Sequence, residues 1–185
     1  DIPLVTSMPA WHLLGSVRYL PLLTGSGCPY RCRFCSGWRL APFARLPLDG
    51  ILATVRHAVA RLGVRRFAFY DDALLVGSRE HAVPLFLALA REFPGISLHT
   101  PNGVHAREVT PAVAQAMRAA GFVDVRLSLE SGDEEYLARS GNKVARREFA
   151  RAVRCLLDAG FAPGQVRAYC LANAPGIPVA SVYAT

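Results

Sequence analysis

The feature that most constrains the fold of this chain is a regular alternation of short apolar segments with longer amphipathic ones. Five apolar segments have the length of buried strands: 19–23, 66–70, 96–99, 123–129 and 166–171. Four segments with apolar residues at helical spacing lie between them: 49–62, 79–92, 110–120 and 146–159. Strands that alternate with helices predict right-handed crossovers and a parallel sheet.

Local signals mark the ends of these helices. Asp49 is expected to cap the first helix, and Gly63 follows its last residue. Thr110 and Pro111 form an N-cap and first-turn pair, since proline is tolerated where the backbone N–H needs no helical partner. The α/β pattern fits either a partial (β/α) barrel or an open doubly wound sheet. Both architectures place ligands at the carboxyl ends of the strands.

The length of 185 residues fits one domain better than two. We expect residues 1–17 to form an irregular lead-in, a linker from an upstream domain, and residues 18–185 to form the core domain. The last segment stops without a terminating element, so we expect a core that is incomplete at its C-terminus and belongs to a longer protein. Hydrophobic residues make up 52% of the chain, yet no apolar run approaches the ~20 residues of a membrane span. No signal peptide is visible.

The net charge of +7 comes almost entirely from arginine, because Lys143 is the only lysine. A basic balance can indicate nucleic acid, an anionic membrane or an acidic partner. The arginines are scattered, and no dense basic stripe with interleaved aromatic residues is present. We therefore expect no membrane partner, and nucleic-acid binding stays only as an alternative function.

Three of the five cysteines, Cys28, Cys32 and Cys35, lie within eight residues in the loop after the first strand. A secreted disulfide scaffold would show an even, dispersed set. The clustered, odd set indicates a reducing compartment, expected to be the cytoplasm, and a local metal site. Three thiolates can ligate three irons of a cubane and leave the fourth iron open. A cluster that acts on a substrate needs such an open position, as a catalytic zinc site does.

Zinc is the main alternative for this triplet, but zinc sites usually carry a second Cys or His pair. Cys155 and Cys170 do not form such a pair, although His12 and His57 could contribute. A purely structural cysteine set is a further alternative. An electron-transfer ferredoxin would need a fourth cysteine at cluster spacing, and the sequence has none.

The cysteine loop has C-x3-C-x-aromatic-C spacing, with Phe34 as the aromatic residue, and resembles the signature of the radical S-adenosylmethionine superfamily. Its position after the first strand of a β/α series is also that of the family. The resemblance covers residues 19–180 and implies a partial (β/α) barrel of the radical SAM type with parallel strands, truncated here after about five strands. It implies that the three cysteines are metal ligands and that Phe34 lines the cofactor.

The resemblance also implies the cofactors, a [4Fe–4S] cluster and S-adenosylmethionine (SAM). In the family, one electron from the cluster cleaves SAM into methionine and a 5′-deoxyadenosyl radical, which abstracts hydrogen from a substrate. A reductant protein such as flavodoxin or ferredoxin is implied as a partner, together with a substrate that the sequence does not identify. The sequence Tyr70-Asp71-Asp72 resembles the subset with an upstream cobalamin-binding domain, so cobalamin-linked methyl transfer is a further hypothesis.

The family's strand ends suggest which residues bind the cofactor. Asp71 and Asp72 stand where many members have a glycine-glycine-glutamate stretch that receives the methionyl amine, and a carboxylate suits an ammonium group. The simpler alternative is that these acids cap the next helix. Asn102 follows the third strand in a tight turn. Ser128 and Glu130 share one face of the fourth strand by alternation and suit ribose hydroxyls.

Other residues near the strand ends have roles that the sequence leaves open. His99 and His105 fit either structural histidines or residues that line the substrate or cofactor. Lys143 lies where related members place a basic residue near the cofactor. Cys155 has apolar neighbours and is expected in the core, whereas Cys170 fits either the core or the active site.

Overall fold

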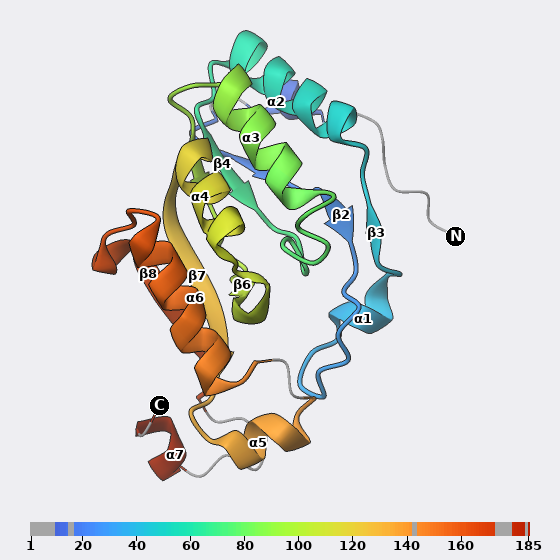
Figure 1. The fold of residues 1–185 in the computed structure, drawn as a ribbon. Coiled ribbons are helices and arrows are strands. Elements are labelled where there is room, and N and C mark those ends of the chain that lie inside the picture. The colour runs from blue at the N-terminus through green and yellow to red at the C-terminus, as the bar shows by residue number, and fades with distance from the viewer. Residues whose placement is uncertain (1–9, 15–16, 142–143, 173–178, 184) are drawn as a thin grey trace.

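The computed structural model describes residues 10–14, 17–141, 144–172, 179–183 and 185, and its centre is a parallel sheet (Figure 1). Five strands are neighbours in chain order: β1 (Leu20–Leu22), β4 (Arg66–Phe69), β5 (Ser97–His99), β7 (Phe122–Glu130) and β8 (Val166–Cys170). A short sixth strand, β6 (Val104–His105), also pairs in parallel with β7, beyond the point where β5 ends.

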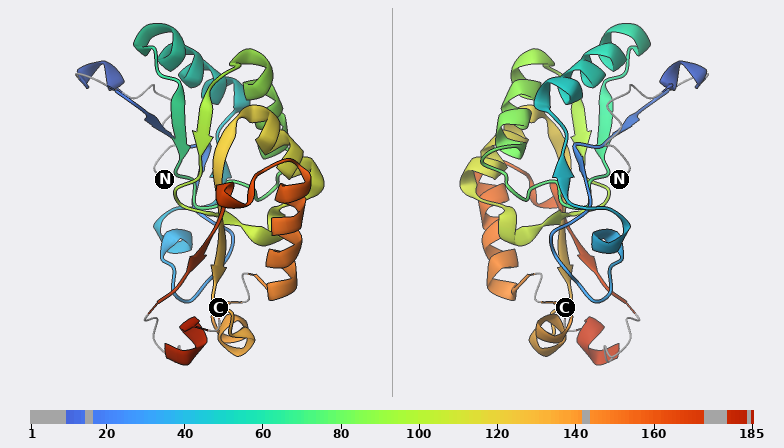
Figure 2. Two further views of the ribbon diagram at one scale, coloured as in Figure 1. Left: turned by 90° about the vertical axis from the view of Figure 1, so that its left-hand side faces the viewer. Right: turned by 90° about the vertical axis from the view of Figure 1, so that its right-hand side faces the viewer.

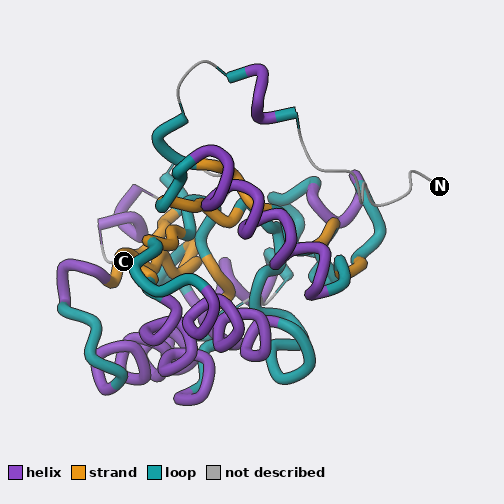
Figure 3. Tube along the Cα trace, turned by 90° about the horizontal axis from the view of Figure 1, so that it is seen from above, coloured by secondary structure: helices purple, strands orange, loops and turns teal. Residues whose placement is uncertain are grey.

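The main helices all cover the same face of this sheet, as Figures 2 and 3 show. They are α2 (Leu48–Leu62), α3 (Ala82–Glu92), α4 (Pro111–Ala120) and α6 (Arg146–Asp158). A doubly wound sheet would place helices on both faces and reverse its strand order at a switch point. The sequential order and the one-sided helices therefore confirm the partial barrel, which is open rather than closed.

The core lies between the sheet and these helices. Phe69 of β4 stacks on Phe122 of β7, with ring centroids 5.6 Å apart, and Phe86 of α3 meets the ring of Phe122 edge-on at 4.9 Å. All three side chains are essentially inaccessible to solvent. Such aromatic pairs stabilise the folded state by about 0.5–1.5 kcal/mol in addition to the gain from burying their apolar area. This cluster therefore fixes the position of α3 on the sheet.

Several short elements lie outside the predicted alternation. β2 (Gly25–Ser26) pairs antiparallel with β3 (Ala44–Arg45), and α1 (Gly37–Leu40) lies between them in the chain. The others are α5 (Glu134–Arg139), α7 (Val179–Tyr183) and the 3-10 turns η1 (Trp11–Leu13), η2 (Ala106–Glu108) and η3 (Pro163–Gln165). Elements of two to six residues are too short to show a hydrophobic period, which is why the sequence did not predict them.

Two predicted helix starts were wrong. Helix α2 begins at Leu48 with Pro47 as its N-cap residue, so Asp49 does not cap it but lies in its first turn. A negative charge there is still favourable, because the N-terminal end of a helix carries partial positive charge. Helix α3 begins at Ala82 rather than at residue 79, and its N-cap residue is His81. Neither Asp71 nor Asp72 caps this helix.

The turns that precede α3 are held from β3. The guanidinium of Arg45 donates hydrogen bonds to the backbone carbonyls of Ala73, Leu74 and Val76. These bonds satisfy carbonyls that have no helical partners, so they stabilise the turn segment between β4 and α3.

The predicted lead-in falls largely on residues outside the described ranges. Within the described part, Trp11 is 7% exposed and packs against the core, so this residue belongs to the folded body. None of the described helices has both the length and the apolar composition needed to cross a membrane.

The predicted N-cap of α4 is present and gives a first testable prediction. The Thr110 hydroxyl accepts a hydrogen bond from the Val113 N–H at 3.2 Å. Thr110→Ala should lower the free energy of unfolding by about 1 kcal/mol, measured by urea denaturation, because it leaves that N–H without its partner.

Thr54→Ala is the matched control for this measurement. The Thr54 hydroxyl only donates to the Gly50 carbonyl inside helix α2, so its removal should change stability by less than about 0.5 kcal/mol. Equal losses in the two variants would show that the hydroxyl of Thr110 does not act as a cap.

Candidate cluster and cofactor site

The cysteine loop runs from β2 to α1, beyond the carboxyl end of β1. Cys32 is 4% exposed, Cys28 is half-buried and Cys35 is exposed. Within the described ranges, no three His, Cys, Asp or Glu side chains lie close enough together to hold a metal ion. The loop offers the chemical set for an iron–sulfur cluster, three thiols within eight residues.

Backbone groups inside the loop fit a bound cluster. The Gly37 N–H donates to Sγ of Cys35 at 3.4 Å, and the Cys35 N–H donates to the Cys32 carbonyl at 3.2 Å. Hydrogen bonds to cysteine sulfur stabilise thiolate ligands and tune the reduction potential of iron–sulfur clusters. The ligand set and this N–H···S contact both fit a [4Fe–4S] cluster held by three cysteines.

The segment after α5 packs directly against the cysteine loop. The Arg33 N–H donates to the Ser140 carbonyl at 2.9 Å. Gly141 has a φ of +115°, and a Cβ there would lie 3.1 Å from Cα of Cys32 and 3.3 Å from the Arg31 carbonyl oxygen. Only glycine allows both this backbone conformation and this approach, so Gly141 sets how closely the two segments meet.

Tyr30 anchors the other side of the loop. Its hydroxyl donates a short hydrogen bond to the Glu108 carboxylate, and its ring meets His105 edge-on at 4.7 Å. The Arg107 guanidinium lies over the same ring at 5.5 Å. Burial raises the pKa of Tyr30, and the bond to Glu108 raises it further, so the phenol stays protonated and keeps donating. The loop is thereby fastened to β6 and η2.

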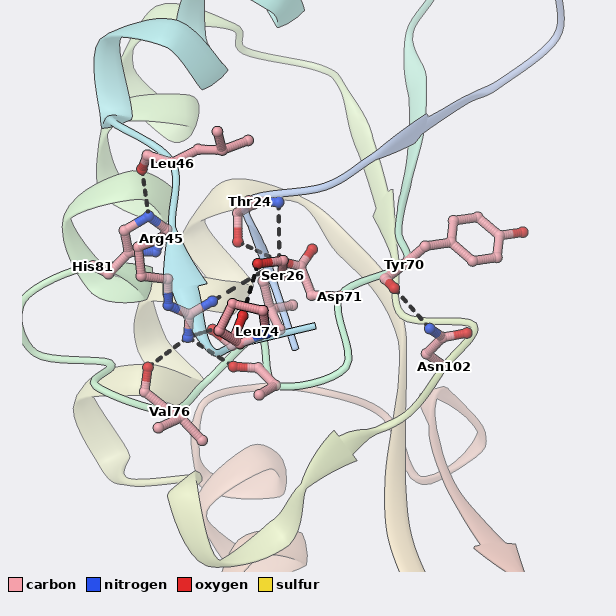
Figure 4. Close-up of polar contacts among 12 residues, drawn as sticks. Thr24, Ser26, Arg45, Leu46, Tyr70, Asp71, Leu74, Val76, His81 and Asn102 are labelled. Carbon is pink, nitrogen blue, oxygen red and sulfur yellow. Dashed lines mark hydrogen bonds and ion pairs between the residues drawn. The ribbon is translucent and has the colours of Figure 1, made fainter. Parts of the chain in front are cut away.

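The carboxylate of Asp71 joins three segments at the base of the loop (Figure 4). Its Oδ1 accepts hydrogen bonds from the backbone N–H and the hydroxyl of Thr24, at 2.9 and 2.6 Å. The Arg45 guanidinium lies 3.8 Å from the same oxygen. Asp71 is 4% exposed, and its Oδ2 has no hydrogen-bond partner in the described structure. Asp71 therefore ties the end of β1 to β3 and to the end of β4.

Asp72 occupies a different environment from Asp71. Its side chain is exposed, and it reaches the cysteine loop. A Cβ built on Gly37 would lie 3.2 Å from Oδ2 of Asp72 and 3.5 Å from Sγ of Cys35. The carboxylate and the thiol thus flank the same glycine, so an acidic group is available beside the predicted cluster ligands.

Ser128 and Glu130 lie buried near the carboxyl end of β7, with exposed fractions of 5% and 7%. Glu130 has a φ of +70°, and no other non-glycine residue in the described ranges has a positive φ. Such a conformation costs on the order of 1–3 kcal/mol and concentrates at functional sites. Burial raises the pKa values of Tyr136 and Cys170, and the negative charge of Glu130 raises both further. This places the carboxylate near both side chains.

The remaining predicted residues are more dispersed. Asn102 is exposed and donates to the Tyr70 carbonyl at 2.8 Å, which links the turn after β5 to the end of β4 (Figure 4). Phe34 is 36% exposed on the cysteine loop. Cys155 is half-buried and packs against the core, as predicted. Lys143 lies outside the described residues.

Sequence reasoning missed several residues that position the site. Thr24, Arg45, Tyr30 and Ser140 each contact a segment that is distant in the chain, and none of them is a defined position of the cysteine signature. Gly141 lies in a polar segment of the sequence, where a glycine predicts only a turn. These contacts join residues from separate segments, and the sequence carries no pattern that pairs such segments. Only the folded structure reveals them.

Comparison with known proteins agrees with this arrangement. The family model described as the Radical SAM superfamily matches residues 22–181. The chain belongs to the radical SAM superfamily. Members of this family use a [4Fe–4S] cluster together with SAM. The match includes the cysteine loop and strands β4, β5, β7 and β8, and it begins at the last residue of β1.

Curated relatives agree on the family. A GTP 3′,8-cyclase from Rhodococcus opacus (strain B4) is 30% identical over 146 residues, which are 76% of this chain and 40% of that protein. The corresponding enzyme from Mycobacterium sp. (strain KMS) is 28% identical over 145 residues. This chain thus spans about two fifths of the length of these relatives.

Solved structures agree on the fold. The radical SAM methyltransferase TsrM from Kitasatospora setae, solved with tryptophan and a SAM analogue, superposes with a TM-score of 0.74 at 20% identity, over 90% of this chain and 33% of that one. The cobalamin-dependent radical SAM enzyme OxsB gives 0.65 at 20% identity, over 83% of this chain and 24% of that one. At this identity they establish the architecture alone.

The burial of Asp71 predicts a pH dependence of stability. Burial raises the pKa of this carboxyl to about 6 from an ordinary 3.8, against the opposing effects of Thr24 and Arg45. Folding therefore favours the protonated carboxyl. Its contribution to the free energy of unfolding is complete below about pH 4 and is lost as the pH rises through about 6. From pH 4 to 7, wild-type protein should lose about 2 kcal/mol of unfolding free energy relative to Asp71→Asn. Urea denaturation from pH 4 to 7 measures this difference, and a constant difference would contradict it.

The close approach at Gly141 gives a further prediction. Gly141→Ala should lower the unfolding free energy by about 1–3 kcal/mol, because the new Cβ is strained and meets the backbone of Cys32. Gly164→Ala is the matched control, since a Cβ there meets nothing within 4 Å. Thermal denaturation of both variants tests this, and an unchanged transition for Gly141→Ala would refute the contact.

Proposed function

We propose that this protein binds a [4Fe–4S] cluster through Cys28, Cys32 and Cys35 and uses it to cleave SAM reductively. When bound, the cluster supplies the electron that breaks the sulfonium bond and yields a 5′-deoxyadenosyl radical for hydrogen abstraction. The observation that carries the proposal is the cysteine triplet itself, on a loop at the carboxyl end of the sheet and beside the Asp72 carboxylate.

Each neighbouring residue has a proposed task in holding SAM. Asp72 is exposed beside Cys35, so its carboxylate suits the methionyl ammonium group, which is a hydrogen-bond donor with a positive charge. Ser128 and Glu130 offer a hydroxyl and a carboxylate at the end of β7, which suit the two ribose hydroxyls. Phe34 and Asn102 border the same end of the sheet. Asp71 supports the site through Thr24 and Arg45 rather than by contact.

A reductant protein such as flavodoxin or ferredoxin is the partner that this chemistry requires, since the electron comes from outside the chain. The exposure of Cys35 on the loop is compatible with such a partner. The predicted cytoplasmic location stays a prediction. The alternative of a nucleic-acid-binding module receives no support from the family match.

Cobalamin-linked methyl transfer remains a separate hypothesis about the reaction. It rests on the sequence Tyr70-Asp71-Asp72, and the structural neighbours TsrM and OxsB are described with cobalamin. Absorption spectra and cobalamin content of the full-length protein after reconstitution with hydroxocobalamin test it. Absence of bound cobalamin would reject this reaction while leaving SAM cleavage intact.

The central prediction concerns the cysteines. After anaerobic reconstitution the wild-type protein should be brown and hold about four irons and four sulfides per chain, with broad absorption near ~400 nm. Cys28→Ala, Cys32→Ala and Cys35→Ala should each lose most of this iron and all formation of 5′-deoxyadenosine from SAM under dithionite.

Cys155→Ala is the control, because this half-buried cysteine lies on α6 and packs against the core. It should keep the iron content of the wild type. A colourless wild-type protein that holds one zinc ion would refute the proposal. So would full iron binding in all three loop variants.

A further inference from the structure

The cysteine loop and helix α1 carry positive charge without an acid of their own. The segment from residue 29 to residue 43 holds three arginines and neither Asp nor Glu. Arg31, Arg33 and Arg39 are all exposed. Helix α1 lies apart from the four main helices (Figures 1 and 2). This positive charge therefore faces the solvent next to the predicted cluster ligands.

Trp38 holds two of these arginines together. The centroid of its ring lies 5.7 Å from Cζ of Arg31 and 4.6 Å from Cζ of Arg39, so both guanidiniums are within cation–π distance of one ring. Two like charges held against the same ring repel each other, and a negatively charged partner relieves that repulsion. The ring also restricts the two side chains, which lowers the entropy that they lose when a partner binds.

Exposed apolar side chains follow these arginines in the chain. Leu40, the last residue of α1, is 78% exposed, and Phe43 is 38% exposed. Exposed apolar side chains bordered by charged ones mark sites of protein–protein contact, where tryptophan and arginine are enriched among the residues that dominate binding. We call the following five residues the α1 patch: Arg31, Trp38, Arg39, Leu40 and Phe43.

The α1 patch is directly connected to a predicted cluster ligand. Helix α1 begins at Gly37, whose N–H donates to Sγ of Cys35 at 3.4 Å. The thiol of Cys35 is itself exposed. Asp72 approaches the same glycine, but its carboxylate is the group proposed above for the methionyl ammonium of SAM. A protein seated on the α1 patch would therefore lie next to the cluster.

We propose that the α1 patch is the docking surface for a flavodoxin, a small acidic protein that carries a flavin and delivers single electrons. This inference rests on the proposed function, which requires an electron from outside the chain. The two arginines meet the acidic surface of the flavodoxin, and Leu40 and Phe43 meet the apolar edge of the flavin ring. The anionic flavin hydroquinone gives one electron to the oxidised cluster and becomes the neutral semiquinone, so no proton is exchanged.

The size and charge of the α1 patch favour this occupant over a nucleic acid. Transient redox complexes form the small end of protein interfaces, below about 1,200 Å² of total buried area, so a few residues are enough. Proteins that bind nucleic acid tightly contact about 6–10 phosphates. The α1 patch has two arginines, and the whole segment has three.

Binding is measured by isothermal titration calorimetry between the full-length, reconstituted protein and an oxidised, acidic bacterial flavodoxin. At about 50 mM salt, the double variant Arg31→Glu/Arg39→Glu should raise Kd about tenfold or more, because two attractions become repulsions. At about 500 mM salt this ratio should fall below about threefold, since salt screens exposed charges. Leu40→Ala should raise Kd about threefold at both salt concentrations, because it removes apolar contact only.

Arg61→Glu/Arg65→Glu is the matched control, with the same change in charge. Arg61 lies in the last turn of α2, and Arg65 directly precedes β4, whereas the cysteine loop lies beyond the carboxyl ends of the strands. Both side chains are exposed. This control should bind flavodoxin within about threefold of the wild type, since its charges lie more than a Debye length from the α1 patch.

Electron delivery separates docking from the chemistry of the cluster. With flavodoxin hydroquinone as the sole reductant, Arg31→Glu/Arg39→Glu should need about tenfold more flavodoxin for half-maximal formation of 5′-deoxyadenosine. With dithionite, a small reductant that needs no docking surface, this variant should match the wild type. If it does not fold by circular dichroism, Arg39→Gln is measured instead and should raise Kd about threefold.

Several outcomes would overturn the inference: flavodoxin does not bind the wild type, the patch variants bind it like the wild type, or the control variant loses as much affinity as they do. Tighter binding of an acidic ferredoxin or of transfer RNA through the same arginines would also overturn it. If SAM is cleaved with dithionite while flavodoxin fails to bind, only the docking surface is wrong. If SAM is not cleaved with dithionite, the proposed function itself fails.

Discussion

The buried carboxylate of Asp71 is the contact on which the site depends. It accepts two hydrogen bonds from Thr24, directly after β1, and lies beside Arg45 of β3, whose guanidinium also binds the carbonyls of the segment after β4. Burial of a carboxylate is costly unless it is hydrogen-bonded, so this group persists only while all three segments stay together. The same burial raises the pKa of Asp71, because it disfavours the charged form of the carboxyl. The backbone between β1 and the cysteine loop is therefore held in place at Thr24.

A second set of contacts fixes the cysteine loop from the opposite side. Tyr30 is held by Glu108 and His105, and the backbone of Arg33 is bonded to Ser140. The two anchors restrain the main chain of the loop, whereas the thiol of Cys35 stays exposed. The main chain of the loop is thereby positioned by contacts of its own, independently of the three cysteine side chains.

The sequence predicted the large elements of this fold and failed on the short ones, for a physical reason. Strands β4, β5 and β7 and helices α4 and α6 carry apolar periods or caps that depend on neighbours in the chain, so a local pattern suffices. The turn segment between β4 and α3 is bonded to Arg45, which lies 28 or more residues earlier, and no local signal contains that contact. The cysteine triplet could be recognised in the sequence, because all three cysteines lie within one local motif whose spacing allows them to bind one cluster.

Asp71 and Asp72 show that the sequence also could not assign the roles of neighbouring site residues. In the sequence Asp71 and Asp72 are equivalent carboxylates after one strand, yet the alternation of the backbone turns one into the protein and the other toward Cys35. The face of the sheet turned away from the main helices extends this argument. A closed barrel fills its interior with layers of bulky apolar side chains, whereas this sheet presents a histidine, an arginine and tyrosines there. His99, Asp124, Arg126 and Tyr169 are joined there by hydrogen bonds, so polar contacts rather than apolar packing fix their positions on the sheet.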